Sequence, residues 1–274
     1  MTRINPSRAA FLNPAILALS RFLIDALERR LEPIRTARTA VALMLAGSNA
    51  NSLVIRKACT HLLKAQVDNS GWSDPEESAW AIGAIRGLGE EEKVLTRSAT
   101  EWLHAVRHPD GGWGLHPRDK ARIKTTALIS ALVPDVIMEK DTQWLAQEWR
   151  KDFSSPVRLS YKAGFFLLAI SNGSEDNLIT QTINHLADDQ NEDGGFGPWK
   201  GHPMGSDPWS TGVVLWGLSK WIENIDIKVI EKAINWLKKT QLPNGYWPYH
   251  YLDDGTSMAL IGAISALKAL AGKN

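Results

Sequence analysis

Three carboxyl groups within four residues are the strongest chemical signal in this sequence. Asp74, Glu76 and Glu77 lie at the start of a predicted helix over 74–88. Like charges crowded into a weakly solvated place raise the pKa of one carboxyl, as a general acid requires. In this interpretation Glu76 donates the proton, and Asp74 and Glu77 hold it. The same residues suit a helix start, with Asp74 as N-cap and Glu77 completing a capping box, so both interpretations stay open.

Further acids stand at the starts of two later predicted helices. Asp207 precedes one of them, and Asp253 and Asp254 begin another, beside Tyr249 and His250. N-capping accounts for Asp207 and for part of the second group. Two adjacent acids next to a phenol and an imidazole are more than a cap needs. We therefore include Asp207, Asp253, Asp254 and His250 among the candidate catalytic residues.

Three histidines, His116, His202 and His250, fall on loops predicted between helices. Imidazoles that converge with carboxylates can bind a metal or shuttle protons. No tight ligand spacing accompanies them, so we predict neither a metal nor another cofactor. His202 is a candidate for substrate contact.

Aromatic side chains supply a second chemical signal, because aromatic faces stabilise cations and also suit an apolar chain. Packing of a protein core is an equally good interpretation. The candidates for substrate contact are Trp80, Tyr161, Phe165, Trp209, Trp216, Trp247 and Tyr249.

Helical periodicity and punctuation divide the chain into two alternating sets of helices. Amphipathic helices are predicted at 13–32, 51–66, 92–107, 138–153, 175–190 and 226–241. Helices that are apolar on most faces are predicted at 34–47, 74–88, 121–133, 157–171, 207–221 and 254–271. The first set needs one wet face and the second needs burial, which predicts six outer and six inner helices.

An internal repeat runs through this pattern. Its fullest copy, Lys232 to Trp247, ends an outer helix in Leu, continues to Gln241 and, after an Asn-Gly turn, reaches Trp247. Weaker copies lie at 56–72, 97–113 and 181–196. Gln at a helix end can bond unpaired backbone groups, and the aromatic ring can cover that end. We expect these Gln and aromatic residues to be scaffold.

The connections after the outer helices are long and rich in Gly, Pro, Trp and His, notably 110–120, 193–206 and 243–254. In a closed α/α barrel they would share one rim, where function is expected. We predict a single toroid domain over 1–274, with 1–12 as a flexible N-terminal segment.

Composition narrows the range of partners. The formal charge of +1 gives no reason to expect nucleic acid, and the lone Cys59 cannot form a disulfide within the chain. The apolar stretch that begins at Phe11 is broken by charged residues, so we expect neither a secretory signal nor a spanning helix. A cytoplasmic protein is expected, with peripheral membrane contact left open and the oligomeric state unknown.

The run from 232 to 247 resembles the QW repeat of squalene and oxidosqualene cyclases, which are similar in fold to the β subunits of protein prenyltransferases. This resemblance implies an all-α (α/α)6 toroid with six outer and six inner helices. Class II cyclases begin catalysis with Asp-x-Asp-Asp-Thr-Ala, whose third position donates the proton. Asp74 to Ala79 matches that pattern in part, whereas Trp209 replaces the donor after Asp207.

The resemblance thus implies a terpene cyclase-like isomerase that binds an isoprenoid or similar apolar substrate in a central cavity. A non-catalytic module that binds lipid or protein is the alternative. Prenyltransferase β subunits are similar around residues 111–124, where Lys120 and Lys124 would hold a diphosphate. Their zinc ligands include a rim cysteine that is lacking here, so a transferase without that zinc site is a further alternative.

Overall fold

The computed structural model describes residues 6–68, 70–171 and 175–273. Within these residues the chain forms helices and turns and no strand. It divides into two compact units, Ser20–Glu148 and a second made of Met1–Leu19 with Trp149–Asn274. The boundaries fall inside α2 (Asn13–Arg29) and α8 (Glu139–Phe153), and each unit is described by itself.

All twelve predicted helices are present within a few residues of their expected bounds. The outer set comprises α2, α4 (Leu53–Lys64), α6 (Arg97–Ala105), α8, α10 (Asp176–Asp189) and α12 (Ile227–Thr240). The inner set comprises α3 (Pro33–Leu45), α5 (Pro75–Arg86), α7 (Ile123–Leu132), α9 (Ser160–Ala169), α11 (Pro208–Ser219) and α13 (Leu252–Gly272). Short 3-10 helices η1 (Ala10–Leu12), η2 (Glu90–Thr96) and η3 (Pro134–Val136) lie between them.

The N-terminal segment and the predicted helix over 92–107 differ from expectation. The segment 1–12, predicted to be flexible, contains α1 (Pro6–Ala9) and η1, while residues 1–5 lie outside the described part. The helix expected at 92 begins as 3-10 helix η2, and regular α-helix starts only at Arg97.

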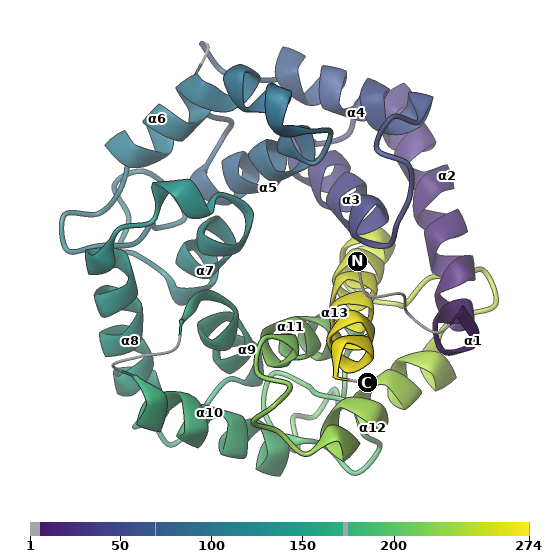
Figure 1. Ribbon diagram of the computed structural model, residues 1–274, viewed down its shortest axis with the longest axis vertical. Helices are drawn as coiled ribbons and strands as arrows, with labels where there is room; N and C mark the ends of the chain where they lie inside the picture. Colours follow the sequence, from purple (N-terminus) through teal and green to yellow (C-terminus); the bar gives the residue numbers. More distant parts are fainter. Residues whose placement is uncertain (1–5, 69, 172–174, 274) are drawn as a thin grey trace. The chain divides into compact units, whose positions relative to one another are not determined.

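In the unit Ser20–Glu148, α5 packs against both α3 and α7 (Figure 1). Asp74 and Pro75 start α5, since the aspartate accepts a backbone hydrogen bond and proline suits the first helical turn. Nearly all residues of α5 are buried, as its apolar composition predicts.

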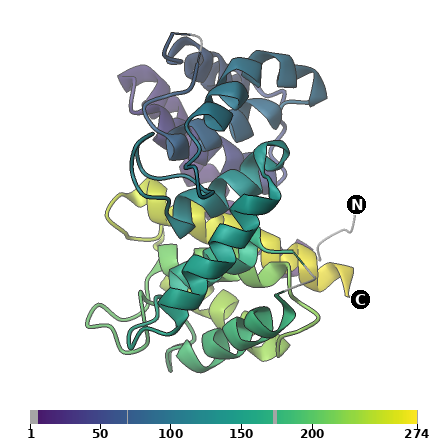
Figure 2. The ribbon, with the colours of Figure 1, turned by 90° about the vertical axis from the view of Figure 1, so that its left-hand side faces the viewer.

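In the other unit, α11 packs between α9 and α13 (Figure 1). Glycine makes this close approach possible: a Cβ on Gly217 would overlap the carbonyl oxygen of Gly164, and one on Gly262 would overlap that of Gly212. In Figure 2 the long connections 190–207 and 241–251 extend on the left, the side on which α13 begins. The N-terminal ends of the inner helices of this unit therefore lie near its long loops.

The repeat builds the same junction four times. Each aromatic backbone N–H donates to a hydroxyl of the following inner helix, and each Trp ring N–H donates to a carbonyl ten residues earlier, in the last turn of the preceding outer helix. The ring pairs are Trp72 with Leu62 (3.0 Å), Trp113 with Leu103 (2.7 Å) and Trp247 with Leu237 (2.8 Å). The backbone pairs are Trp72 with Ser78, Trp113 with Thr126, Phe196 with Thr211 and Trp247 with Thr256.

The glutamines of the repeat brace the turn that follows each outer helix. The Gln190 amide donates to the carbonyl of Gly194 (2.9 Å) and Gln241 donates to that of Gly245 (3.0 Å), while Gln66 bonds Ser70. These bonds satisfy backbone carbonyls of the turn, five or six residues beyond the end of each outer helix. The scaffold function expected for the repeat is therefore visible as hydrogen bonds.

Among the described residues, two helical stretches are long and apolar enough to cross a membrane by length and hydropathy alone, Ser7–Arg29 and Leu252–Gly272. The first passes this test although its charged residues led us to expect otherwise. The most apolar part of the second, α13, is 72% buried within the protein, as in the core helix of a globular domain.

Candidate active site

The carboxyl groups of Asp74 and Glu77 hold helix ends. Asp74 accepts a hydrogen bond from the backbone N–H of Glu77 (2.8 Å), and Glu77 accepts one from Ser73 (3.2 Å). The other oxygen of Glu77 accepts from the backbone N–H of Ile34 (3.1 Å), in the first turn of α3. One buried carboxylate thus serves the N-terminal ends of two inner helices, where the helix dipole favours negative charge.

Replacing Glu77 by alanine is expected to lower the free energy of unfolding by about 2 kcal/mol, because two part-buried backbone donors lose a charged acceptor. Urea denaturation at neutral pH measures the change. Glu101→Ala, at an exposed site on α6, is the control and should shift stability by less than about 0.5 kcal/mol. Equal effects of the two substitutions would contradict the double capping function.

Glu76 forms an ion pair across the inner helices of its unit. Its carboxylate lies 2.9 Å from the ammonium of Lys124, and its side chain is 9% exposed against 38% for the lysine. Lys124 comes from the first turn of α7 and was predicted to bind a diphosphate. In this structure the ammonium of Lys124 pairs with the carboxylate of Glu76. Glu76 is therefore a paired carboxylate rather than an isolated acid.

A cluster of aromatic rings lies where α9, α11 and α13 begin, in the other unit. Trp209 is its centre: Tyr161 and Phe165 meet it edge-on at centroid distances of 5.5 and 5.8 Å, and Tyr249 stacks on it at 6.0 Å with 7° between the planes. Three of the four rings, those of Tyr161, Trp209 and Tyr249, are half-buried. Part of each of these faces is therefore accessible to a ligand.

Asp207 is the acid at this cluster. It caps α11 by accepting the backbone N–H of Ser210 (2.7 Å), and it is 8% exposed. Burial raises the pKa of its carboxyl, and this effect outweighs the opposing hydrogen bonds from Ser210 and Trp209 and the charge of His202. A buried carboxyl with a raised pKa beside aromatic faces is the arrangement that proton donation to an apolar substrate requires.

The raised pKa of Asp207 has a consequence for stability. Below the unfolded-state pKa the carboxyl of Asp207 is protonated in both states. As pH rises above that value the unfolded state loses this proton more readily than the folded state does, so the contribution of Asp207 to the free energy of unfolding falls. Asp207→Asn keeps an oxygen for the cap and removes the ionisation. We expect the stability of the variant relative to the wild type to increase between pH 3.5 and pH 7, measured by urea denaturation; a constant difference would contradict the pKa shift.

Tyr249 connects Asp207 to the other predicted acids. Burial raises the pKa of its phenol, and the charges of Asp207, Asp254 and Tyr161 act in the same direction. Asp254 is half-buried and Asp253 is almost fully buried, both in the first turn of α13. His250 is exposed, with its ring 4.5 Å from that of Tyr249. The structure thus brings together Asp207, Tyr249 and Asp254, with His250 at the edge.

The remaining candidates lie outside this cluster. His202 packs edge-on against Trp199 at 4.3 Å, and its charge acts on Asp207. His116 and Lys120 are exposed on the 114–122 connection of the other unit. Among the described residues no group of three His, Cys, Asp or Glu side chains is placed to hold a metal ion.

Three tryptophans predicted to contact substrate are buried. Trp80 is 1%, Trp216 is 9% and Trp247 is 0% exposed. The ring N–H of Trp247 donates to the backbone carbonyl of Leu237. In this conformation Trp80 and Trp247 have essentially no surface for a ligand. Their burial fits the alternative weighed from the sequence, that these rings fill the core.

Comparison with known proteins gives the class of this fold. Residues 54–247 and 161–270 match the prenyltransferase alpha-alpha toroid domain. The chain belongs to this family, which confirms the predicted all-α toroid fold class. No curated protein is detectably similar to it in sequence.

Solved structures agree on the fold. A variant of the type II terpene cyclase MstE from Scytonema, in complex with its substrate geranylgeranyl dihydroxybenzoate, has a TM-score of 0.72 and 15% identity, covering 97% of this chain and all of that one. The same cyclase without ligand has a TM-score of 0.70 and 16% identity over 97% of this chain and 99% of that one. The ent-copalyl diphosphate synthase of Streptomyces platensis has a TM-score of 0.61 and 15% identity, covering 88% of this chain and half of that one.

Proposed function

We propose that this protein is a terpene cyclase-like enzyme that binds an isoprenoid or similar apolar chain and starts its cyclisation with a carboxylic acid. One observation carries the proposal: a buried acid with a raised pKa, Asp207, shares the start of α11 with Trp209, whose ring is surrounded by Tyr161, Phe165 and Tyr249. The fold is that of proteins which perform such chemistry, and MstE is described with a geranylgeranyl-bearing substrate.

Asp207 takes the part that the sequence assigned to Glu76. A proton donor must release its proton into an apolar site, and Glu76 is held by the ammonium of Lys124 at 2.9 Å. Among the described residues Asp207 forms no ion pair within 4.0 Å, and its burial favours the protonated form. The charges of Asp207 and Asp254 both act on Tyr249, which would orient the acid and the substrate.

The proposed reaction transfers the Asp207 proton to one carbon of a substrate double bond. The cation formed at the other carbon is attacked by the next double bond, which closes a ring. The aromatic faces stabilise each cation by roughly 0.5–2 kcal/mol per ring. Loss of a proton from a neighbouring carbon ends the sequence, so that the product is an isomer of the substrate. Solvent then reprotonates Asp207, which retains 8% exposure.

Incubation with a panel of polyprenyl substrates tests this function. The panel contains geranylgeraniol, geranylgeranyl diphosphate and a geranylgeranylated hydroxybenzoate, analysed by liquid chromatography and mass spectrometry. We expect a product of unchanged mass and altered retention from at least one member. Release of diphosphate would instead indicate a transferase or an ionising cyclase. Retention of a polyprenyl ligand without any conversion would indicate the alternative of a non-catalytic binding module.

A further inference from the structure

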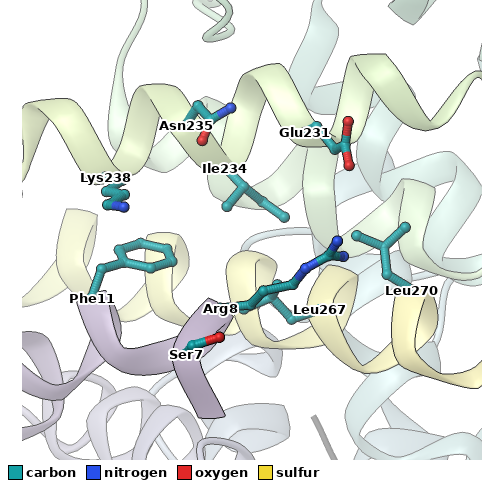
Figure 3. Close-up of a pocket in the computed structure, with 9 residues that line it drawn as sticks. All are labelled: Ser7, Arg8, Phe11, Glu231, Ile234, Asn235, Lys238, Leu267 and Leu270. Carbon is teal, nitrogen blue, oxygen red and sulfur yellow. The ribbon is translucent and has the colours of Figure 1, made fainter. Parts of the chain in front are cut away.

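One pocket lies away from the aromatic cluster. It occupies about 370 Å³ between the N-terminal segment α1 and η1, the outer helix α12 and the last turns of α13 (Figure 3). Leu267 on α13 follows Asp254 by thirteen residues, which places the pocket about 20 Å along that helix from the end at which the proposed active site lies. The pocket and the proposed active site are therefore separate places on one unit.

The floor of the pocket is apolar. Ile234 from α12 and Leu267 and Leu270 from α13 are 9%, 4% and 7% exposed. The ring of Phe11 lies opposite Ile234, as Figure 3 shows. These three side chains are nearly buried already, so the half-buried ring of Phe11 supplies most of the apolar surface that a bound chain would still remove from water, at roughly 25 cal/mol per Å².

The mouth of the pocket is cationic. Arg8 and Lys238 line it and are exposed, and within the described part of the chain neither has an ion-pair partner within 4.0 Å. Asn235 adds a side-chain amide, and Glu231 is the one acidic residue of the lining. Figure 3 shows Arg8 reaching toward Glu231 and Lys238 standing near Phe11 at the opposite end. Lys238, about two turns along α12 from Glu231, is therefore the cation farther from this acid, and Asn235 lies between them.

We infer that this pocket binds a monomeric amphipathic carboxylate, with the carboxylate at Lys238 and Asn235 and the chain against Phe11, Ile234 and Leu267. Charge complementarity selects an anion, since two cations face one acid. At roughly 30 Å³ for each non-hydrogen atom the volume holds about 12 such atoms, the size of decanoate. Because the pocket is bounded by α1, α12 and α13 and holds about 370 Å³, it fits a single chain rather than a membrane surface.

Equilibrium dialysis with labelled decanoate, below its micelle concentration, tests this site on the full chain. We expect saturable binding at one site, and an increase in Kd of about tenfold for the double variant Arg8→Gln/Lys238→Gln. Ile234→Trp fills the floor and is expected to raise Kd by at least about tenfold. Lys239→Gln is the matched control: Lys239 follows Lys238 on α12, does not line the pocket, and its loss should leave Kd unchanged within about twofold.

Two further ligands fix the chemical class. Decan-1-ol has the same chain without the charge and is expected to bind about tenfold more weakly, with no response to Arg8→Gln/Lys238→Gln. Sedimentation with phosphatidylglycerol vesicles tests a lipid surface as the source of the anion. Circular dichroism and Tm confirm that each variant is folded.

Three results would overturn the inference. One is equal affinity of the wild type and Ile234→Trp for decanoate, and another is equal loss of affinity in Lys239→Gln and the double variant. The third is vesicle binding that depends on Arg8 and Lys238 while monomeric decanoate does not bind.

Discussion

Replacing Asp207 by asparagine is expected to lower the rate of cyclisation about 100-fold or more. General acid catalysis contributes roughly 10² to 10⁴ in rate, and asparagine cannot donate a comparable proton. The substitution is nearly isosteric and keeps an oxygen for the backbone N–H of Ser210, so α11 retains its cap. Initial rates of formation of the isomeric product measure the effect, with Tm as the check on folding.

Glu76→Gln is the matched comparison, because Glu76 was the donor indicated by the sequence. Glutamine loses the ion pair with Lys124 but should leave turnover within about threefold of the wild type. The opposite pattern, with Asp207→Asn active and Glu76→Gln inactive, would return the acid to Glu76.

Replacing Trp247 by alanine is expected to lower the free energy of unfolding by about 4 kcal/mol. Removal of a fully buried aromatic side chain typically costs about 3–5 kcal/mol. Trp247 is 0% exposed, and its ring N–H also satisfies the carbonyl of Leu237 at the end of α12. Urea denaturation measures the change in midpoint.

Trp247→Phe separates the ring from its hydrogen bond. The protein already uses phenylalanine at the matching place in another copy of the repeat, where Phe196 is 0% exposed. We therefore expect Trp247→Phe to cost only about 1–2 kcal/mol, the loss of one hydrogen bond and a small volume. A cost close to that of alanine would show that the indole N–H, and not the buried ring, holds the junction.

The helices could be predicted because the sequence marks both their faces and their ends. The pairs Asp74-Pro75 and Asp207-Pro208 start α5 and α11 where the pattern indicates. The sequence predicted the Gln and Trp junctions but not their hydroxyl partners, since Thr211 and Thr256 have no recognisable spacing from Phe196 and Trp247. Their separations of 15 and 9 residues depend on the length of the loop between them.

The site was harder to predict because its chemistry depends on contacts far apart in sequence. Glu77 reaches Ile34, 43 residues away, and Glu76 reaches Lys124 in another helix. These contacts decide whether a carboxyl group caps a helix, forms an ion pair or acts as an acid. Helical periodicity in the sequence gives no information about them. Asp207, Trp209 and Tyr249 were each candidates, but the sequence alone did not show that they adjoin.

Cyclisation in heavy water tests directly whether Asp207 donates the proton that starts the reaction. A type of cyclisation that begins with proton transfer from an exchangeable carboxyl must place one deuterium on carbon for each product molecule formed in D2O. We expect a cyclised product one mass unit heavier than in H2O, made by the wild type and at least about 100 times more slowly by Asp207→Asn. A cyclised product without deuterium, or full incorporation by Asp207→Asn at the wild-type rate, would contradict this expectation.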